Sequence, residues 1–145
     1  MSGTTDAAGE AAARALYSTD RASQALGMTL VEAGAGTATV TMTVRADMTN
    51  GHGICHGGFV FALADSAFAF ACNSHGAPTV AAGVTVDFVA PAHVDARLTA
   101  VAREQWQGGR TGLYDITVTA ADGSVVAFMR GRSHRLGRRA TGADS

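Results

Sequence analysis

One stretch, from Asn50 to His75, constrains the fold more than any other part of the chain. It opens with a polar, glycine-rich loop and continues, from Gly57 to Cys72, as a segment that is apolar on all sides apart from Asp65 and Ser66. A helix without a polar face is typical of the interior of a domain. A carboxylate in such a helix is costly unless it is paired, protonated or used in chemistry. The stretch therefore predicts a central buried helix that carries an ionisable group.

Length and composition narrow the class of protein. With 145 residues, of which 47% are hydrophobic and 16% charged, the chain is typical of one globular domain with its own core. We expect this domain to span residues 1–145, with a core over about 15–136 and flexible tails. The net charge of −1 argues against a nucleic-acid partner. The apolar run is short for a membrane span and the start of the chain has no signal-like pattern, so we expect a cytoplasmic protein with reduced thiols and no membrane contact.

Periodicity and turn residues predict the remaining elements. The expected elements are an N-terminal helix at the edge of the domain (7–26, ended by Gly27, after a disordered 1–6), strands at 28–33 and 37–44, the central helix, and a four-stranded meander (79–90, 97–106, 112–120, 124–136). An Asp122-Gly123 pair between the last two strands is a strong hairpin signal. The order predicts an α+β fold in which one antiparallel sheet wraps around one central helix. Because a single sheet covers only one side of that helix, a second subunit is expected to cover the rest.

Asp65 and the start of the central helix are the candidate chemical groups. Apolar neighbours at 61, 62, 64, 68 and 69 make a simple surface role for Asp65 hard to arrange, so the carboxylate is read as a general base or a nucleophile rather than as a structural cap. Gly57 and Gly58 either permit a tight loop-to-helix turn or expose helix-start N–H groups that stabilise an oxyanion. His56 and Asn50 lie just upstream, where a histidine more often holds a loop than catalyses.

A metal site is the competing interpretation. His52, Cys55 and His56 precede the helix and Cys72 and His75 end it, with spacings that resemble those of zinc ligands. The two groups flank a helix of about sixteen residues, roughly 24 Å long, and one tetrahedral site does not reach both ends. We therefore expect no metal, and we interpret Cys72 as a small buried apolar residue.

The last strand carries a cluster of cations. Arg130, Arg132 and His134 share one side of it, and three further arginines follow (Arg135, Arg138 and Arg139). They form either a solvated edge that prevents aggregation or a phosphate site, since arginine suits phosphate geometry. The residues alone do not decide between these two interpretations.

Several motifs together resemble one family. Asn50-Gly51-His52-Gly53-x-Cys55-His56-Gly57-Gly58, Leu63-Ala64-Asp65, Ala71-Cys72-Asn73-Ser74, Val86-Asp87-Phe88, the Gly-Arg-Thr-Gly-Leu-Tyr-Asp stretch at 109–115 and Arg130–Arg135 resemble the hotdog-fold thioesterases of the phenylacetate degradation pathway (PaaI type). The resemblance covers nearly the whole chain except the two tails. One departure is Phe59, where the family leads us to expect a polar residue.

The resemblance implies both an activity and an assembly. It implies a hotdog fold, hydrolysis of phenylacetyl-CoA and its ring-hydroxylated relatives, homodimers paired into homotetramers, and no metal or other cofactor. It assigns the catalytic carboxylate to Asp65 and the oxyanion-hole amide to Gly57, with His56 and Asn50 beside it and Thr85 near the attacking water. The substrate and CoA contacts that it implies are Gly58, Arg110, Thr111, Arg130, Arg132 and Ser133. The alternatives are a hydratase or dehydratase on the same fold and a non-catalytic acyl-CoA binding protein.

Overall fold

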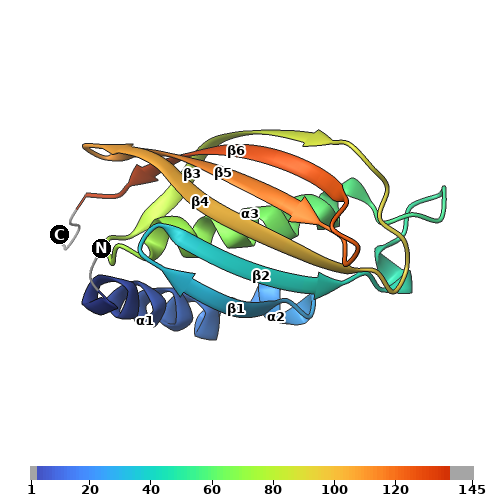
Figure 1. Ribbon diagram of the computed structural model, residues 1–145, viewed down its shortest axis with the longest axis horizontal. Coiled ribbons are helices and arrows are strands. Elements are labelled where there is room, and N and C mark those ends of the chain that lie inside the picture. The colour runs from blue at the N-terminus through green and yellow to red at the C-terminus, as the bar shows by residue number, and fades with distance from the viewer. Residues whose placement is uncertain (1–2, 138–145) are drawn as a thin grey trace.

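The chain folds as one antiparallel sheet of six strands curved around a central helix, as the computed structural model of residues 3–137 shows (Figure 1). This confirms the α+β class and the predicted wrapping of a sheet around one helix. The elements are α1 (Gly3–Thr19), α2 (Arg21–Ala25), β1 (Thr29–Gly34), β2 (Thr37–Thr43), the 3₁₀ turn η1 (Ala46–Met48), α3 (Gly57–Asn73), β3 (Thr79–Phe88), β4 (Arg97–Gly108), β5 (Thr111–Thr119) and β6 (Val125–Arg135).

Helix α3 and the sheet form the core because their apolar periodicities face each other. Strand β5 alternates strictly, with Tyr114, Ile116 and Val118 buried and their neighbours half-exposed. Strand β2 also alternates, since Val40 and Met42 are buried on its inner side, although Thr41 on the other side is also largely covered. Glycine is needed at Gly131, where a Cβ atom would lie 2.7 Å from the ring of Phe68 on α3. The core therefore lies between α3 and the inner face of the sheet.

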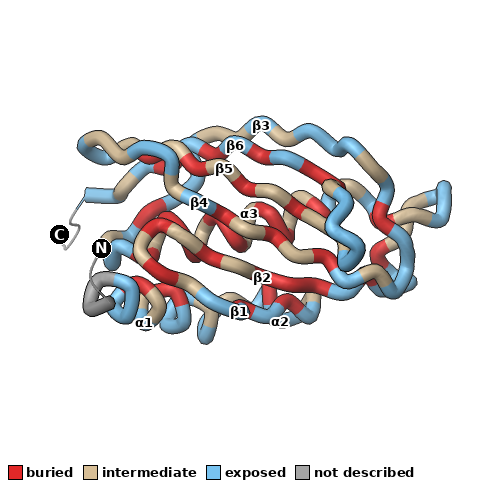
Figure 2. Tube along the Cα trace, viewed as in Figure 1, coloured by how far each residue is buried: buried red, intermediate tan, exposed pale blue. Residues whose placement is uncertain are grey.

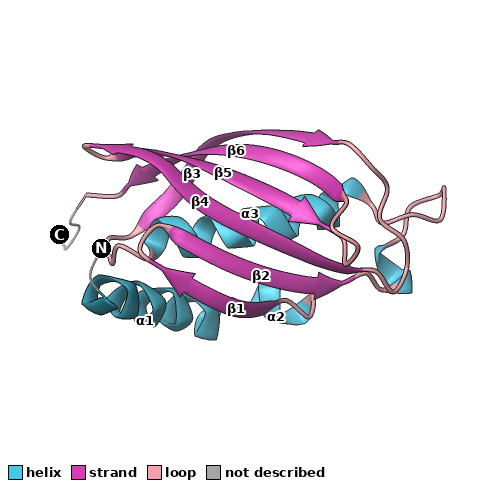
Figure 3. Cartoon of the chain, viewed as in Figure 1, coloured by secondary structure: helices cyan, strands magenta, loops and turns pink. Residues whose placement is uncertain are grey.

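The order of the strands corrects the predicted four-stranded meander. Strands β4, β5 and β6 are consecutive neighbours, but β3 pairs with β6 at the far edge of a sheet ordered β1-β2-β4-β5-β6-β3. The reason is that α3 crosses the inner face of the sheet before β3 begins, so β3 emerges at the opposite edge. Residues 89–96 then return across one end of the sheet to β4 (Figure 3). Because β3 is an edge strand, Phe88 at its end is 52% exposed, although it shares a face with Val84 and Val86.

The N-terminal segment also differs from the prediction. Helix α1 already begins at Gly3, and the single helix expected over 7–26 is broken at Asp20, which caps a separate α2. The Asp20 side chain accepts a hydrogen bond from Ser23 N at 2.9 Å, as N-cap residues do. Gly27 follows α2 with a φ of 73°, a conformation that favours glycine. The fraying predicted for the C-terminal tail falls on 138–145, outside the described residues.

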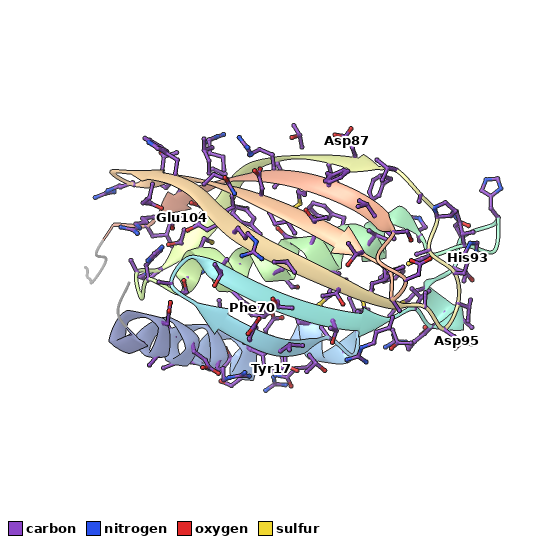
Figure 4. The ribbon with its side chains drawn as sticks, viewed as in Figure 1. Tyr17, Phe70, Asp87, His93, Asp95 and Glu104 are labelled. Atoms are coloured by element: carbon purple, nitrogen blue, oxygen red, sulfur yellow. The ribbon has the colours of Figure 1, made fainter. Side chains whose placement is uncertain are left out.

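Helix α1 packs beside the edge strand β1, as predicted, and is attached there by several side-chain contacts. The Tyr17 ring packs edge-on against Phe70 of α3, with 5.8 Å between ring centroids (Figure 4). Its hydroxyl donates to Met28 O at 2.7 Å, and Arg14 donates to the carbonyl oxygens of Leu30 and Val31. Because these contacts join α1 to both α3 and the sheet, the end of α1 has a fixed position relative to the centre of α3.

The side of α3 that faces away from the sheet is only partly covered. Buried residues of α3 alternate with half-exposed ones that include Phe61, Ala62, Asp65, Ser66 and Ala69 (Figure 2). Residues three and four apart share one side of a helix, so these five form a continuous strip. Part of the strip meets α2 through a Ser23–Ser66 contact, and the rest is the surface for which the sequence predicts a second subunit.

Candidate active site

Asp65 opens into a cavity of about 490 Å³, which we call the Asp65 cavity. It lies between the second half of α3, the start of β3 and the α1–α2 junction. Besides Asp65, residues that line it include Leu16, Asp20, Ala69, Cys72, Val80 and Ala81. The lining is mostly apolar, as in sites that bind an apolar group and orient it with a few polar atoms.

The electrostatics of this cavity favour Asp65 as a base. Burial raises the pKa of the Asp65 carboxyl above its usual value, and the nearby Asp20 carboxylate raises it further. A carboxylate with a raised pKa accepts a proton more readily once it is ionised. Burial also raises the pKa of Cys72 to about 12, so its thiol is protonated at neutral pH and is a poor nucleophile. The interpretation of Cys72 as a small buried residue is confirmed by its 2% exposure.

The start of α3 is organised by the side chain of His56. This residue is the N-cap, with extended backbone angles of −61° and 134°, and its Nδ1 accepts a hydrogen bond from Gly58 N at 3.0 Å. An accepting Nδ1 leaves the ring proton on Nε2. The first helical N–H, that of Gly57, donates to no acceptor within residues 3–137. Of the two glycine amides proposed for an oxyanion hole, Gly57 is therefore available and Gly58 is already used by the cap.

Asn50 holds the loop that leads into α3. Its side-chain Oδ1 accepts hydrogen bonds from His52 N at 2.9 Å and Ile54 N at 3.3 Å, and its backbone N–H donates to Ile54 O. Asn50 and Gly57 line a second cavity of about 300 Å³, which we call the Gly57 cavity and which also contains Phe88 from the end of β3. The structure therefore brings Asn50 and Gly57 to one cavity, whereas His56 caps the helix beside it.

The two cavities are separate within one chain. No residue of the described part, 3–137, lines both of them. The helix begins at Gly57 and Asp65 lies eight residues further on, a rise of roughly 12 Å at 1.5 Å per residue. A carbonyl held at the Gly57 N–H is therefore out of reach of a water held by Asp65 of the same straight helix.

Thr85 lies on the opposite side of the sheet from Asp65, which corrects its predicted place beside the attacking water. Val84 and Val86 pack against the core, so the alternating Thr85 projects from the outer face. There it lines an outer hollow of about 430 Å³ together with Asp115, Phe128 and Arg130. The β3 residues that do approach Asp65 are those before a bulge between Ala81 and Gly83, which resets the alternation.

The predicted CoA contacts are scattered over the fold. Arg130 and Arg132 project from the outer face, as expected, but Arg130 already forms an ion pair with Asp115 and Arg132 donates to Ala82 O at 3.3 Å. Arg110 and Thr111 lie at the β4–β5 turn, where Arg135 N donates to Arg110 O. Ser133 needs correction, because its inward side chain is 1% exposed and is beyond the reach of CoA. Its Oγ has no hydrogen-bond partner within residues 3–137.

Sequence reasoning missed the contribution of the N-terminal segment. Leu16 and Asp20 line the Asp65 cavity, although the sequence predicts only one helix at the domain edge there. An Asp at 20 followed by Ser at 23 is an N-cap pattern that identifies the break. No local signal in the sequence connects that break to Asp65.

The residues of the zinc interpretation do not gather. Across residues 3–137 there is no group of three or more His, Cys, Asp or Glu side chains placed to hold a metal ion. His75 instead pairs with Glu104 (Figure 4). Glu104 also accepts a hydrogen bond from the Tyr114 hydroxyl at 2.9 Å. No helix within residues 3–137 is both long and apolar enough to cross a membrane.

Comparisons with known proteins point to one family. A family model described as the thioesterase superfamily matches residues 52–127. The acyl-coenzyme A thioesterase PaaI of Escherichia coli is 48% identical over 130 residues, which are 90% of this chain and 93% of that protein. The structure of the E. coli PaaI protein from the phenylacetic acid degradation operon matches with a TM-score of 0.90, over 97% of this chain and 99% of that one. The identity over this structural match is 43%. A mutant of PaaI from Thermus thermophilus matches with a TM-score of 0.78 and 41% identity, over 81% of this chain and 100% of that one.

Proposed function

Because the chain belongs to the thioesterase superfamily, we propose that it hydrolyses acyl-CoA thioesters to a free acid and CoA, with phenylacetyl-CoA and its ring-hydroxylated relatives as substrates. The single observation that carries the reaction is Asp65, an ionisable group with a raised pKa on the wall of a mostly apolar cavity. Two findings support this class of acyl group: the E. coli relative is an acyl-coenzyme A thioesterase, and its protein comes from the phenylacetic acid degradation operon. A CoA-linked substrate is also the basis for proposing a cytoplasmic location.

The reaction needs a base or nucleophile on one side of the thioester carbonyl and an oxyanion donor on the other. Asp65 either takes a proton from the attacking water or attacks the carbonyl carbon itself. The developing oxyanion accepts a hydrogen bond from Gly57 N–H at the positive end of the α3 dipole. The carbon–sulfur bond then breaks, and the CoA thiolate takes up a proton and leaves as the thiol. Where Asp65 itself attacks, water then hydrolyses the acyl–Asp65 anhydride, which releases the acid and regenerates the carboxylate. The His56 cap and the Asn50 loop keep the Gly57 amide in place.

We further propose that each active site is completed by two subunits. The Asp65 and Gly57 cavities are separate in one chain, and the strip of α3 around Asp65 is only partly covered. A two-fold dimer supplies the missing half, because each α3 offers its start to the Asp65 of its partner. Pairing of two such dimers gives the homotetramer that the family resemblance implies.

Release of free CoA tests the proposed function directly. Purified protein is mixed with phenylacetyl-CoA, and the new thiol is detected with a thiol reagent. We expect catalytic release with phenylacetyl-CoA and with its ring-hydroxylated relatives. Tight binding of the ester without thiol release would instead favour a non-catalytic acyl-CoA binding protein.

Arg130→Ala combined with Arg132→Ala is expected to raise KM for CoA thioesters, with a smaller effect on kcat. The two arginines are proposed to bind the phosphates of CoA, which are remote from the reacting carbonyl. Loss of these contacts therefore weakens binding of the substrate and of the transition state alike. Steady-state kinetics at two salt concentrations measure this effect. Asp115→Ala is the matched control, since it breaks the Arg130 ion pair and keeps both guanidinium groups. An unchanged KM with unchanged salt dependence would leave this strand as a solvated surface.

A further inference from the structure

Asp20 is held rigidly at the junction of α1 and α2. One carboxylate oxygen accepts from Ser23 N at 2.9 Å, and the other accepts from Ser23 Oγ at 2.7 Å. The same Ser23 hydroxyl lies 2.8 Å from the hydroxyl of Ser66, the residue next to Asp65 on α3. Ser23 at the centre of these contacts is 2% exposed, whereas Asp20 and Ser66 are half-buried. The carboxylate of Asp20 is thereby connected to the turn of α3 that carries the candidate catalytic group.

Asp20 also faces the candidate catalytic carboxylate across a shared space. Both residues line the Asp65 cavity, whose other walls are mostly apolar. The only other titratable side chain among the described lining residues is Cys72, and its thiol is uncharged at neutral pH. Asp20 is therefore the one described charged group on the cavity wall that acts on Asp65, and its negative charge opposes ionisation there.

The position of this charge does not depend on α2 alone. Tyr17 and Arg14 attach α1 to Phe70 and to the carbonyl oxygens of β1. Leu16 of the same helix lines the cavity beside Asp20. Asp20, the N-cap of the short helix α2, is therefore supported by the packing of α1 against the core.

We propose that Asp20 is a positioning residue for thioester hydrolysis, which presents a fixed negative charge to Asp65 and, through Ser23 and Ser66, holds the turn of α3 that carries it. This inference rests on the proposed function of Asp65. Its chemical consequence is a more basic Asp65, which is a stronger proton acceptor or nucleophile once it is ionised. The N-cap role of Asp20 is then secondary to its charge.

Asp20→Asn separates these two roles. Asparagine is as good an N-cap as aspartate, so α2 keeps its start while the charge is lost. The acidic limb of the profile of kcat/KM against pH is expected to move to lower pH. At a pH on that limb, the variant should retain a fraction of its plateau rate at least about twofold larger than the wild type retains. The plateau itself is expected to fall severalfold, because Asp65 becomes a weaker base.

Two matched variants complete the experiment. Asp20→Glu keeps the charge and disturbs the cap, so its acidic limb should stay at the wild-type pH. Ser23→Ala keeps the charge and the backbone N–H bond to Asp20 but removes the hydroxyl contacts with Asp20 and Ser66, so it should lower the plateau and leave the limb in place. If Asp20→Asn does not fold, Asp20→Ser offers a second neutral residue that caps helices well. A limb that stays in place in a folded neutral variant would show that Asp20 is only a cap and would overturn the proposal.

A titration without substrate separates this proposal from the proposed function. The carboxyl carbon of Asp65 is followed by NMR against pH in protein labelled with ¹³C-aspartate and assigned with Asp65→Asn. We expect its midpoint to fall in Asp20→Asn and to stay in Asp20→Glu. An identical midpoint in wild type and Asp20→Asn would refute the role of Asp20. A protein that releases CoA from none of the proposed thioesters would refute the proposed function, whatever the titration shows.

Discussion

Asp65→Asn is expected to lower kcat for phenylacetyl-CoA by at least about 10²-fold, because the proposed base or nucleophile is lost while the shape of the side chain is kept. Binding of the substrate should change little, since the cavity is lined mostly by apolar groups that the substitution does not touch. Steady-state kinetics and the affinity for a non-hydrolysable analogue measure the two effects separately.

The same variant should fold at least as well as the wild type at neutral pH. The pKa of Asp65 is raised in the folded chain, so the unfolded chain ionises this group at a lower pH. The folded state therefore binds more protons between the two pKa values, and the contribution of Asp65 to stability falls as pH rises through them. At neutral pH the full cost of an ionised, half-buried carboxylate is present, and asparagine removes it. Thermal melts at pH 4 and pH 7 measure this difference.

A carboxylate that lines neither cavity provides the control for Asp65→Asn. Asp122 lies exposed in the β5–β6 turn and accepts hydrogen bonds from Ser124, which asparagine also does. Asp122→Asn is expected to leave kcat and KM unchanged. Near-normal turnover by a folded Asp65→Asn protein would sink the assignment of Asp65 as the catalytic group.

Mixed dimers of two inactive variants are expected to recover roughly a quarter of wild-type activity, if each site is shared between subunits and the sites are independent. One variant is Asp65→Ala, and the other is Gly57→Pro, which removes the proposed oxyanion donor. When the two chains are unfolded and refolded together, half of random dimers are mixed. Each mixed dimer rebuilds one of its two sites, from Asp65 of one chain and Gly57 of the other.

The structure favours Gly57→Pro as a substitution that removes an amide and preserves the helix. Gly57 is the first residue of α3, where proline is well accommodated, and the extended backbone of His56 suits a following proline. The nearest obstacle is the ring of Phe88, 3.3 Å from the position of a Cβ atom, and that side chain is half-exposed. Gly57→Ala is the matched control, because it meets the same ring and keeps the N–H.

The comparison of these two variants makes the experiment specific. Gly57→Ala should retain most activity because it keeps the backbone N–H. Gly57→Pro should lose activity because proline has no N–H to donate to the oxyanion. Native mass spectrometry confirms that mixed dimers form after refolding. Absence of recovery in demonstrated mixed dimers of folded chains would mean that each site is built within one subunit.

Local patterns in the sequence were sufficient for the central helix, the hairpin and the position of the candidate carboxylate. The run from Gly57 to Cys72 is apolar on all sides, so it is stable only as a buried helix. The Asp122-Gly123 pair favours a tight turn, in which Gly123 has a positive φ. Asp65 was identifiable because an ionisable group in an apolar helix is exceptional in any fold.

Tertiary structure alone decided which groups meet Asp65. Strand β3 reaches the far edge because α3 crosses the sheet, and its bulge turns Ala81 toward the Asp65 cavity and Thr85 away from it. Period-two reasoning carries one phase along a strand, so a single extra residue defeats it. Ser23 and Ser66 are 43 residues apart, and their contact, with the Asp20 charge beside it, follows from packing of α1 against β1 and α3. Periodicity in the sequence indicates which face of an element is buried, but it does not indicate which residues lie against that face. For that physical reason the sequence alone identified the candidate catalytic carboxylate, Asp65, and only the fold placed a second carboxylate, Asp20, on the wall of the same cavity.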